Sequence, residues 1–173
     1  MKFLVIICLL GLLLTGCSQP ETLETVGDEL YQPELPEKMH ASFQMPPNAV
    51  AETMQDQDNG TVYFCDGYTM IAYTTPSGDL KQTISQISGY DLSQLCIMET
   101  KQGNCKRYSF VWVSAGETEE QVCRCTVLDD GGYHYVLTAM ADASQAGKLT
   151  ETWNEVFSSF RLQHPSEVVN SGS

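Results

Sequence analysis

The chain has 173 residues, with 22 Asp and Glu against 9 Lys and Arg, and a formal net charge of −13. This length accommodates one domain with a sizeable hydrophobic core rather than two. The negative charge argues against binding to nucleic acid and against docking on an anionic membrane surface, because both partners are polyanions.

An apolar run, Phe3–Leu14, follows Lys2 and ends close to a cysteine. This is the pattern of a signal peptide, and the run is too short to span a membrane as a helix, which takes about 20 residues. Leu14-Thr15-Gly16-Cys17 resembles the lipobox of bacterial lipoproteins. The resemblance implies cleavage before Cys17 and acylation of its thiol, with palmitate-like chains anchoring the protein on the extracytoplasmic side of the cell membrane. The alternative is an uncleaved signal anchor.

The remaining chain divides into three parts by composition. Residues 17–38 are rich in Glu, Pro and Thr, which predicts an extended acidic tether after the signal peptide of residues 1–16. Residues 163–173 are polar and lack periodicity, so we expect a disordered tail. A single domain is therefore expected at residues 39–162.

The first half of this domain is predicted to contain a strand, a hairpin and a helix. Apolar residues alternate over residues 39–45, a strand pattern that Pro46-Pro47 ends. Asp66-Gly67 separates two apolar segments, residues 61–65 and 68–75, and predicts a hairpin. Leu80, Ile84 and Ile87 then have helical spacing, and Gly89 follows as a C-terminal cap.

The second half is predicted to be a strand meander closed by a helix. The strands are expected at residues 95–100, 106–114, 121–129 and 133–141, with a tight turn at residues 129–132. Ser144 can cap the last helix, whose apolar stripe consists of Leu149, Trp153, Val156, Phe157 and Phe160. The predicted fold class is α+β: an antiparallel sheet of about six to seven strands, covered on one face by the short mid-chain helix and the C-terminal amphipathic helix.

This order of elements resembles the PsbP-like fold, named from an extrinsic photosystem II subunit and shared by bacterial lipoproteins. The resemblance covers roughly residues 39–162, and its most specific stretch is YHYVLTAMADASQAGKLTETWNEVFSSFRL at residues 133–162. It implies a role in binding or assembly rather than catalysis, and it transfers no functional residue.

The expected domain contains five cysteines: Cys65, Cys96, Cys105, Cys123 and Cys125. An odd number cannot pair completely within the chain, and two positions two apart on one strand make a poor bridge. We expect these thiols to be small buried apolar side chains. Free thiols in an extracytoplasmic protein would suit a habitat with little oxygen.

A metal site is one alternative interpretation of these cysteines. Cys123 and Cys125, with His134 on the next strand, could supply S, S and N ligands to zinc or copper(I), as in an extracellular thiolate metal-binding protein. The spacing differs from the paired C-x2-C pattern of structural zinc sites. The acidic segment at residues 56–60 does not fit a calcium loop, because its Gly comes one position early, and we interpret it as a turn.

A minor hydrolase is the second alternative. Cys125 or Ser109 could act as a nucleophile with His134 and Asp129. However, the sequence contains no G-x-S-x-G, H-E-x-x-H or P-loop motif, which makes an enzyme the less favoured interpretation. We expect no cofactor.

The favoured function is a binding or assembly module for an unidentified protein or envelope component. If both helices cover one face of the sheet, the other face should bind this partner, with Tyr108, Trp112, Tyr133 and Tyr135 as candidate contact residues. The alternative is that the tether or the first strand packs across that face.

Overall fold

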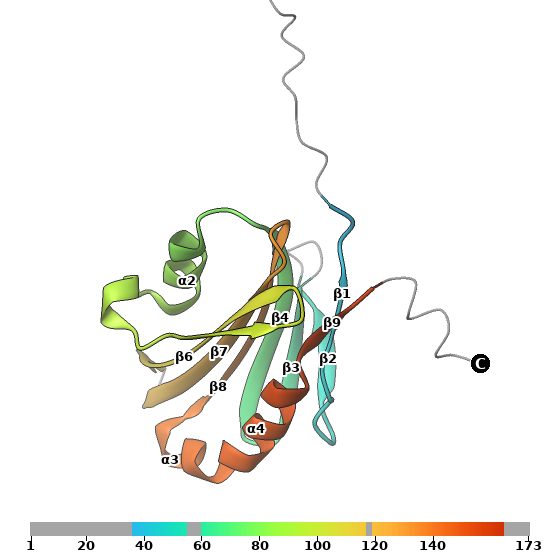
Figure 1. Cartoon of the computed structure of the whole chain (residues 1–173). Helices are drawn as coiled ribbons and strands as arrows, with labels where there is room; N and C mark the ends of the chain where they lie inside the picture. Colours follow the sequence, from blue (N-terminus) through green and yellow to red (C-terminus); the bar gives the residue numbers. More distant parts are fainter. Residues whose placement is uncertain (1–35, 55–59, 117–118, 165–173) are drawn as a thin grey trace, which may run out of the picture. The chain divides into compact units, whose positions relative to one another are not determined.

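The computed structural model of the chain describes residues 36–54, 60–116 and 119–164 (Figure 1). The strands are β1 (His40–Ser42), β2 (Val50–Thr53), β3 (Thr61–Cys65), β4 (Tyr68–Pro76), β5 (Met98–Gln102), β6 (Cys105–Ala115), β7 (Glu120–Asp129), β8 (Tyr133–Asp142) and β9 (Arg161–Gln163). The helices are α2 (Leu80–Ser88), α3 (Ala143–Ala146) and α4 (Thr150–Ser159), with the 3-10 helices η2 (Leu92–Gln94) and η3 (Gly147–Leu149). Within the described ranges, no helix is long and apolar enough to cross a membrane. The expected signal peptide, Cys17 and most of the tether and tail lie outside these ranges.

Seven strands form one antiparallel sheet in the order β2-β3-β4-β8-β7-β6-β5. The strands β1 and β9 form a separate two-stranded antiparallel sheet, in which His40 lies opposite Gln163. The predicted α+β fold class, with an antiparallel sheet of this size, a short mid-chain helix and a C-terminal helix, is confirmed.

The predicted hairpin turns form where short polar residues and glycine allow the chain to reverse. Gly67, between β3 and β4, has a φ of 79°, a conformation that favours glycine. In the turn between β7 and β8, Asp130 Oδ1 accepts hydrogen bonds from the backbone N–H groups of Gly132 (2.8 Å) and Tyr133 (2.7 Å). Gly132 is also required by close packing, because a Cβ atom there would lie 2.1 Å from Pro36 Cγ.

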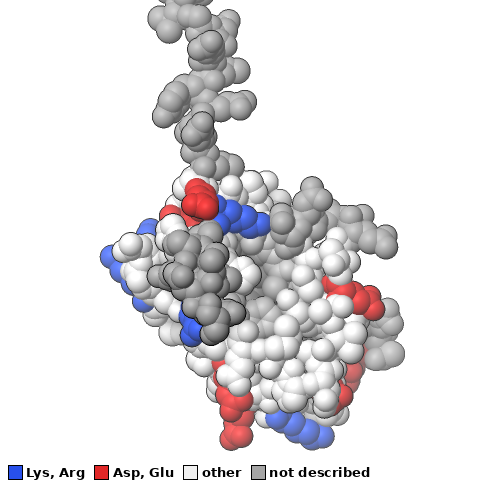
Figure 2. All heavy atoms as spheres, turned by 90° about the vertical axis from the view of Figure 1, so that its right-hand side faces the viewer, with Lys and Arg blue, Asp and Glu red and all other residues white. Residues whose placement is uncertain are grey.

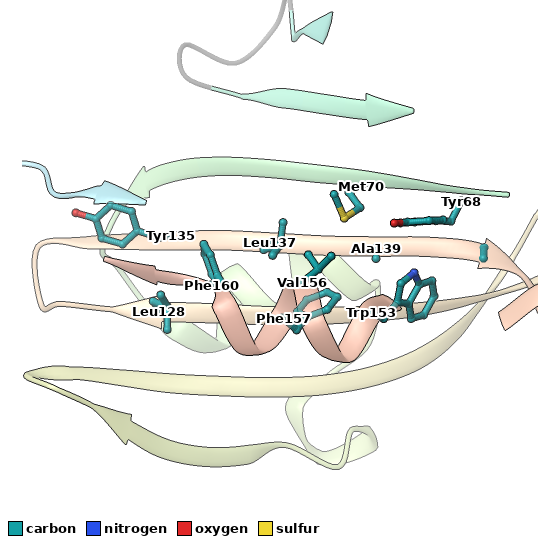
Figure 3. Packing of buried hydrophobic residues seen from close by; sticks show 11 residues of the cluster. Tyr68, Met70, Leu128, Tyr135, Leu137, Ala139, Trp153, Val156, Phe157 and Phe160 are labelled. Carbon is teal, nitrogen blue, oxygen red and sulfur yellow. The ribbon is translucent and has the colours of Figure 1, made fainter. Parts of the chain in front are cut away.

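The helix α4 covers one face of the sheet with an apolar stripe. Its residues Trp153, Val156 and Phe157 are buried and point toward side chains of β4 and β8 in Figure 3. This α4-side cluster contains Tyr68, Met70, Leu128, Tyr135, Leu137, Ala139, Ala141, Trp153, Val156, Phe157 and Phe160. Arg107 of β6 donates hydrogen bonds to the carbonyls of Phe157 and Phe160, and so satisfies the C-terminal end of the helix.

The helix α2 covers the opposite face, which corrects the prediction that both helices lie on one face. Its fully buried Ile84 belongs to a separate α2-side cluster, which contains Ile84, Tyr108, Phe110, Trp112, Cys123, Cys125, Val127 and Val136. The physical reason is the composition of β8, where three consecutive apolar residues, Tyr135, Val136 and Leu137, are fully buried. A strand that is apolar on both faces must be covered on both.

Several element boundaries differ from the prediction. The first strand covers only residues 40–42, residues 95–97 precede β5 rather than belong to it, and β2 and β9 were not predicted. Ser144 lies inside α3, where its hydroxyl donates to Glu119 Oε1 (2.8 Å), so it does not cap α4. In contrast, α2 begins as predicted, with the Asp79 side chain accepting from the N–H of Lys81, and ends at Gly89.

Candidate functional site

The four aromatic residues expected to bind a partner do not share an open surface. Tyr108 and Trp112 are each 7% exposed and belong to the α2-side cluster, whereas Tyr135 is fully buried in the α4-side cluster and the half-buried Tyr133 packs against that cluster. The hydroxyl of Tyr135 donates to Asp130 Oδ2 (2.8 Å) and accepts from the N–H of Met39 (2.8 Å). Because Tyr108 and Trp112 are covered on the α2 side and Tyr135 on the α4 side, these aromatic residues do not form an uncovered face in the described part of the chain.

The candidate metal ligands are not brought together either. Cys125 lies opposite Thr138 of β8, whereas His134 lies opposite Asp129. Four residues along a strand separate these positions on β8, roughly 13 Å at about 3.4 Å per residue, so one metal ion cannot bind both. Burial also raises the pKa of the Cys125 thiol to about 12, which keeps it protonated. Among the described residues, no group of three or more His, Cys, Asp or Glu side chains is arranged to hold a metal.

All five domain cysteines are free thiols in the structure. Cys105, Cys123 and Cys125 are buried, as expected for cysteines that act as small apolar side chains, whereas Cys65 is half-buried. Cys96 departs from the expectation because it is exposed.

The residues considered for a hydrolase are divided between the two faces of the sheet. Ser109 contacts Thr126 through their hydroxyls (3.0 Å) on the α4 side. His134 lies on the α2 side, where its Nδ1 atom is 2.9 Å from Thr83 Oγ1. Only His134 and Asp129 approach each other, with 4.0 Å between Nε2 and Oδ1. Neither Ser109 nor Cys125, the two nucleophiles considered, is therefore hydrogen-bonded to this histidine within the described residues.

His134 instead joins α2 to the sheet. The imidazole is 1% exposed, and its hydrogen bond to Thr83 connects β8 to the buried side of α2. Burial lowers the pKa of His134, while the Asp129 and Asp130 carboxylates act in the opposite direction. The neutral imidazole is therefore the form that the folded protein prefers.

This preference makes the stability of the fold depend on pH. We expect the free energy of unfolding to fall as the pH drops below about 6.5, because the unfolded chain then protonates His134 more readily than the folded one. The loss has a ceiling of about 1.4 kcal/mol per pH unit. The variant His134→Asn cannot titrate in this range, so its stability should fall less steeply. Urea unfolding at a series of pH values measures the difference, and parallel curves for the two proteins would contradict the prediction.

An apolar area remains in contact with solvent on the α2 side of the sheet, beyond the strands that α2 covers. Val50 of β2 and Phe64 of β3 lie opposite each other and are 59% and 46% exposed. Val62 and Ile71 form the next pair toward the centre of the sheet and are half-buried. The register fixes the side, because Ile71 lies opposite Thr138, which lies opposite Cys125 of the α2-side cluster. We call Val50, Val62, Phe64 and Ile71 the β2–β3 patch.

A second exposed apolar area lies at the other end of the sheet, on the α4 side. Val111 and Val113 of β6 are 55% and 44% exposed, and Met98 of β5 is 62% exposed. Val111 also borders a groove of about 300 Å³, whose other lining residues are Val122, Arg124, Ala146, Gly147, Thr150 and Trp153. We call Met98, Val111 and Val113 the β6 patch.

The two patches differ in the charge around them. The sequence contains no Lys or Arg between Lys38 and Lys81, a segment that includes β1 to β4 and the whole β2–β3 patch. In contrast, Arg124 lies opposite Val111 in the β6 patch. Figure 2 looks at the side where Figure 1 places β1, β2 and β9, and shows a broad uncharged area with charged side chains at its rim.

No sequence signal marked Val50 or Phe64, because each looks like an ordinary apolar strand residue.

Comparison with known proteins gives a fold but no family. No family model matches the sequence, and no curated protein matches it either. The solution structure of cyanobacterial PsbP (CyanoP) from Synechocystis sp. PCC 6803 is similar, with a TM-score of 0.53 at 11% identity over 71% of this chain and 86% of that chain. The crystal structure of LpqN, involved in cell envelope biogenesis of Mycobacterium tuberculosis, has a TM-score of 0.51 at 12% identity over 74% and 86%.

These similarities place the chain in the class of α+β proteins with a PsbP-like fold. The resemblance that the order of elements indicated is thus confirmed for the fold. At such identities the similarity transfers neither a ligand nor a functional residue.

Proposed function

We propose that the protein is a lipoprotein held at the extracytoplasmic side of the cell membrane through Cys17, and that its folded body binds a protein or another envelope component. The lipobox-like sequence supports the anchor. LpqN provides an example of this fold in a protein involved in cell envelope biogenesis.

The observation that carries the binding role is the β2–β3 patch. Two large apolar side chains, Val50 and Phe64, lie opposite each other in solvent at the open edge of the main sheet. Clustered exposed apolar side chains mark interaction sites, because their contact with water is unfavourable until a partner covers them. The metal-binding and hydrolytic alternatives lack such support, since the side chains that each of them needs do not come together in one site.

The binding role can be tested with the full lipidated chain immobilised in detergent and exposed to solubilised envelopes of the native host. We expect saturable retention of one or a few components, which excess free lipidated protein displaces. A different lipoprotein of similar charge is the control and should not compete. Retention that free protein cannot displace, or no retention above the control, would contradict a binding module.

A further inference from the structure

We propose that β2 is extended by a strand from a cationic partner polypeptide, which pairs with the free edge of β2 and packs apolar side chains on the β2–β3 patch. This inference rests on the proposed function. It specifies the surface that binds the partner, the way in which the partner binds and the partner's chemistry. The expected partner segment is extended and carries an apolar residue and a Lys or Arg two positions apart.

The backbone of β2 is available for pairing along one side. Within the described residues, β2 pairs only with β3, and all four of its residues are exposed. The N–H of Met54 donates to Gly60 O (3.0 Å), and hydrogen-bonded pairs alternate along an antiparallel ladder. The backbone N–H and C=O groups of Val50 and Glu52 therefore form hydrogen bonds with β3, whereas those of Ala51 and Thr53 point to the outer edge.

This edge is short and carries one charged residue, Glu52, but it lacks Lys and Pro, two features that usually prevent strand addition. Native proteins protect edge strands by keeping them short, by placing charged side chains (especially Lys) or Pro on them, and by bulges or covering segments. The strand β2 is Val-Ala-Glu-Thr and contains neither Lys nor Pro. The opposite edge strand, β5, is Met-Glu-Thr-Lys-Gln and includes Lys101. Among the described residues, the two edge strands of the main sheet thus differ, because β2 has neither Lys nor Pro beside the β2–β3 patch, whereas β5 places Lys101 beside Met98 of the β6 patch.

The side chains of β2 specify the partner. Val50 and Glu52 point to the same face, since they are two positions apart on a strand. An added strand lies about 4.8 Å away, so one of its side chains would cover Val50, and the next on that face would lie opposite Glu52. An apolar residue at the first position and a cation at the second give favourable cross-strand pairs.

The charge of the surrounding surface favours the same partner. No Lys or Arg occurs from residue 39 to residue 80, so β1 to β4 offer an added strand no cation of their own. A second copy of this chain would bring the same acidic strand and a net charge of −13, which repels. Anionic lipid headgroups are disfavoured for the same reason. A cationic polypeptide is the occupant that fits both the edge and the charge.

A peptide-binding experiment tests the surface directly. The probe is the fluorescent decapeptide Val-Thr-Lys-Thr-Val-Thr-Lys-Thr-Val-Thr, and its control has Glu in place of both Lys residues. We expect the full lipidated chain to bind the Lys peptide about tenfold or more tightly than the Glu peptide, with the difference shrinking as salt is added. Equal binding of the two peptides would overturn the inferred partner charge.

Matched variants locate the binding. Val50→Ser should weaken binding of the Lys peptide about tenfold. Val111→Ser replaces the same residue type at almost the same exposure in the β6 patch, and should leave binding unchanged. Thr53→Pro removes one outward N–H from the edge and should have at least the effect of Val50→Ser. Equal effects of Val50→Ser and Val111→Ser would overturn the site, and this comparison does not depend on whether the Pro variant folds.

Photo-crosslinking in intact envelopes identifies the occupant. A photoreactive residue at position 53 on β2 should crosslink to a polypeptide that contains the apolar-and-cationic pattern, and one at position 101 on β5 should not. A crosslinked second copy of the chain, a crosslinked lipid or a crosslink from β5 alone would each overturn the inference. If envelope components are still retained by displaceable binding in any of these cases, the proposed function stands and only the β2 surface fails.

Discussion

The variant Trp153→Ala is expected to lower the free energy of unfolding by about 3–5 kcal/mol, the usual range for truncation of a large aromatic residue in a packed core. Trp153 is 4% exposed and belongs to the α4-side cluster. Its ring meets that of Tyr68 edge to face, with 6.1 Å between ring centroids, and both are visible in Figure 3. The truncation would leave a cavity between α4 and the sheet, because the surrounding strands cannot collapse into it.

Chemical denaturation of both proteins measures this loss. Glu155→Ala, on the exposed side of the same helix, is the control and should change stability by less than about 0.5 kcal/mol. Trp153→Phe separates volume from polarity, because Trp153 Nε1 is buried without a hydrogen-bond partner among the described residues. Loss of that unsatisfied donor should offset part of the lost packing, so this variant should cost less than Trp153→Ala. A loss below about 1 kcal/mol for Trp153→Ala would show that α4 is peripheral to the core.

The second large effect concerns the proposed anchor. Cys17→Ala should remove the lipid entirely and move the protein from the lipid-anchored membrane fraction to a soluble or uncleaved precursor pool. The acyl chains account for the membrane binding, because each buried methylene adds about 0.8 kcal/mol of membrane affinity and stable anchoring takes two chains. Cell fractionation and mass spectrometry of the N-terminus measure the outcome.

A control for this experiment lies in the same segment. Cys8 is the other cysteine of the first 17 residues and falls inside the apolar run. Cys8→Ala should therefore keep both the lipid mass and the membrane association of the wild-type protein. A Cys17→Ala variant that stays fully membrane-associated, with its N-terminal segment removed, would contradict the proposed lipoprotein.

The sequence predicted those parts of the fold that depend on local chemistry. The hairpin at Asp66-Gly67, the turn at residues 129–132 and the cap of α2 at Gly89 all follow from residues that favour tight turns or helix ends. The strands β2 and β9 were missed because they contain three or four residues without apolar alternation. Such short strands form because a neighbouring strand pairs with them, and this partner is not encoded locally.

The candidate site was less accessible to prediction, for a physical reason. Tyr108 and Trp112 are apolar and regularly spaced, but so is Phe64, and spacing does not tell which of them a helix will cover. Two short helices cannot cover a seven-stranded sheet, so some apolar residues near its edges stay in solvent. One signal was nevertheless present, because the consecutive apolar residues Tyr135, Val136 and Leu137 indicate a strand that is buried on both faces.

The pairing of β1 with β9 has a mechanical consequence. Hydrogen bonds hold both ends of β1. Just before the strand, the Met39 N–H donates to Tyr135 Oη, and just after it, the Gln44 N–H donates to Ser159 Oγ (2.7 Å). The strand β1 also pairs over its whole length with β9. A pulling force applied between residue 36 and β2 therefore acts first on β1, on its two hydrogen bonds and on its pairing with β9. These hydrogen bonds pass the load to β8, which carries Tyr135, and to α4, which carries Ser159, so β1 detaches only when both bonds and its pairing with β9 break.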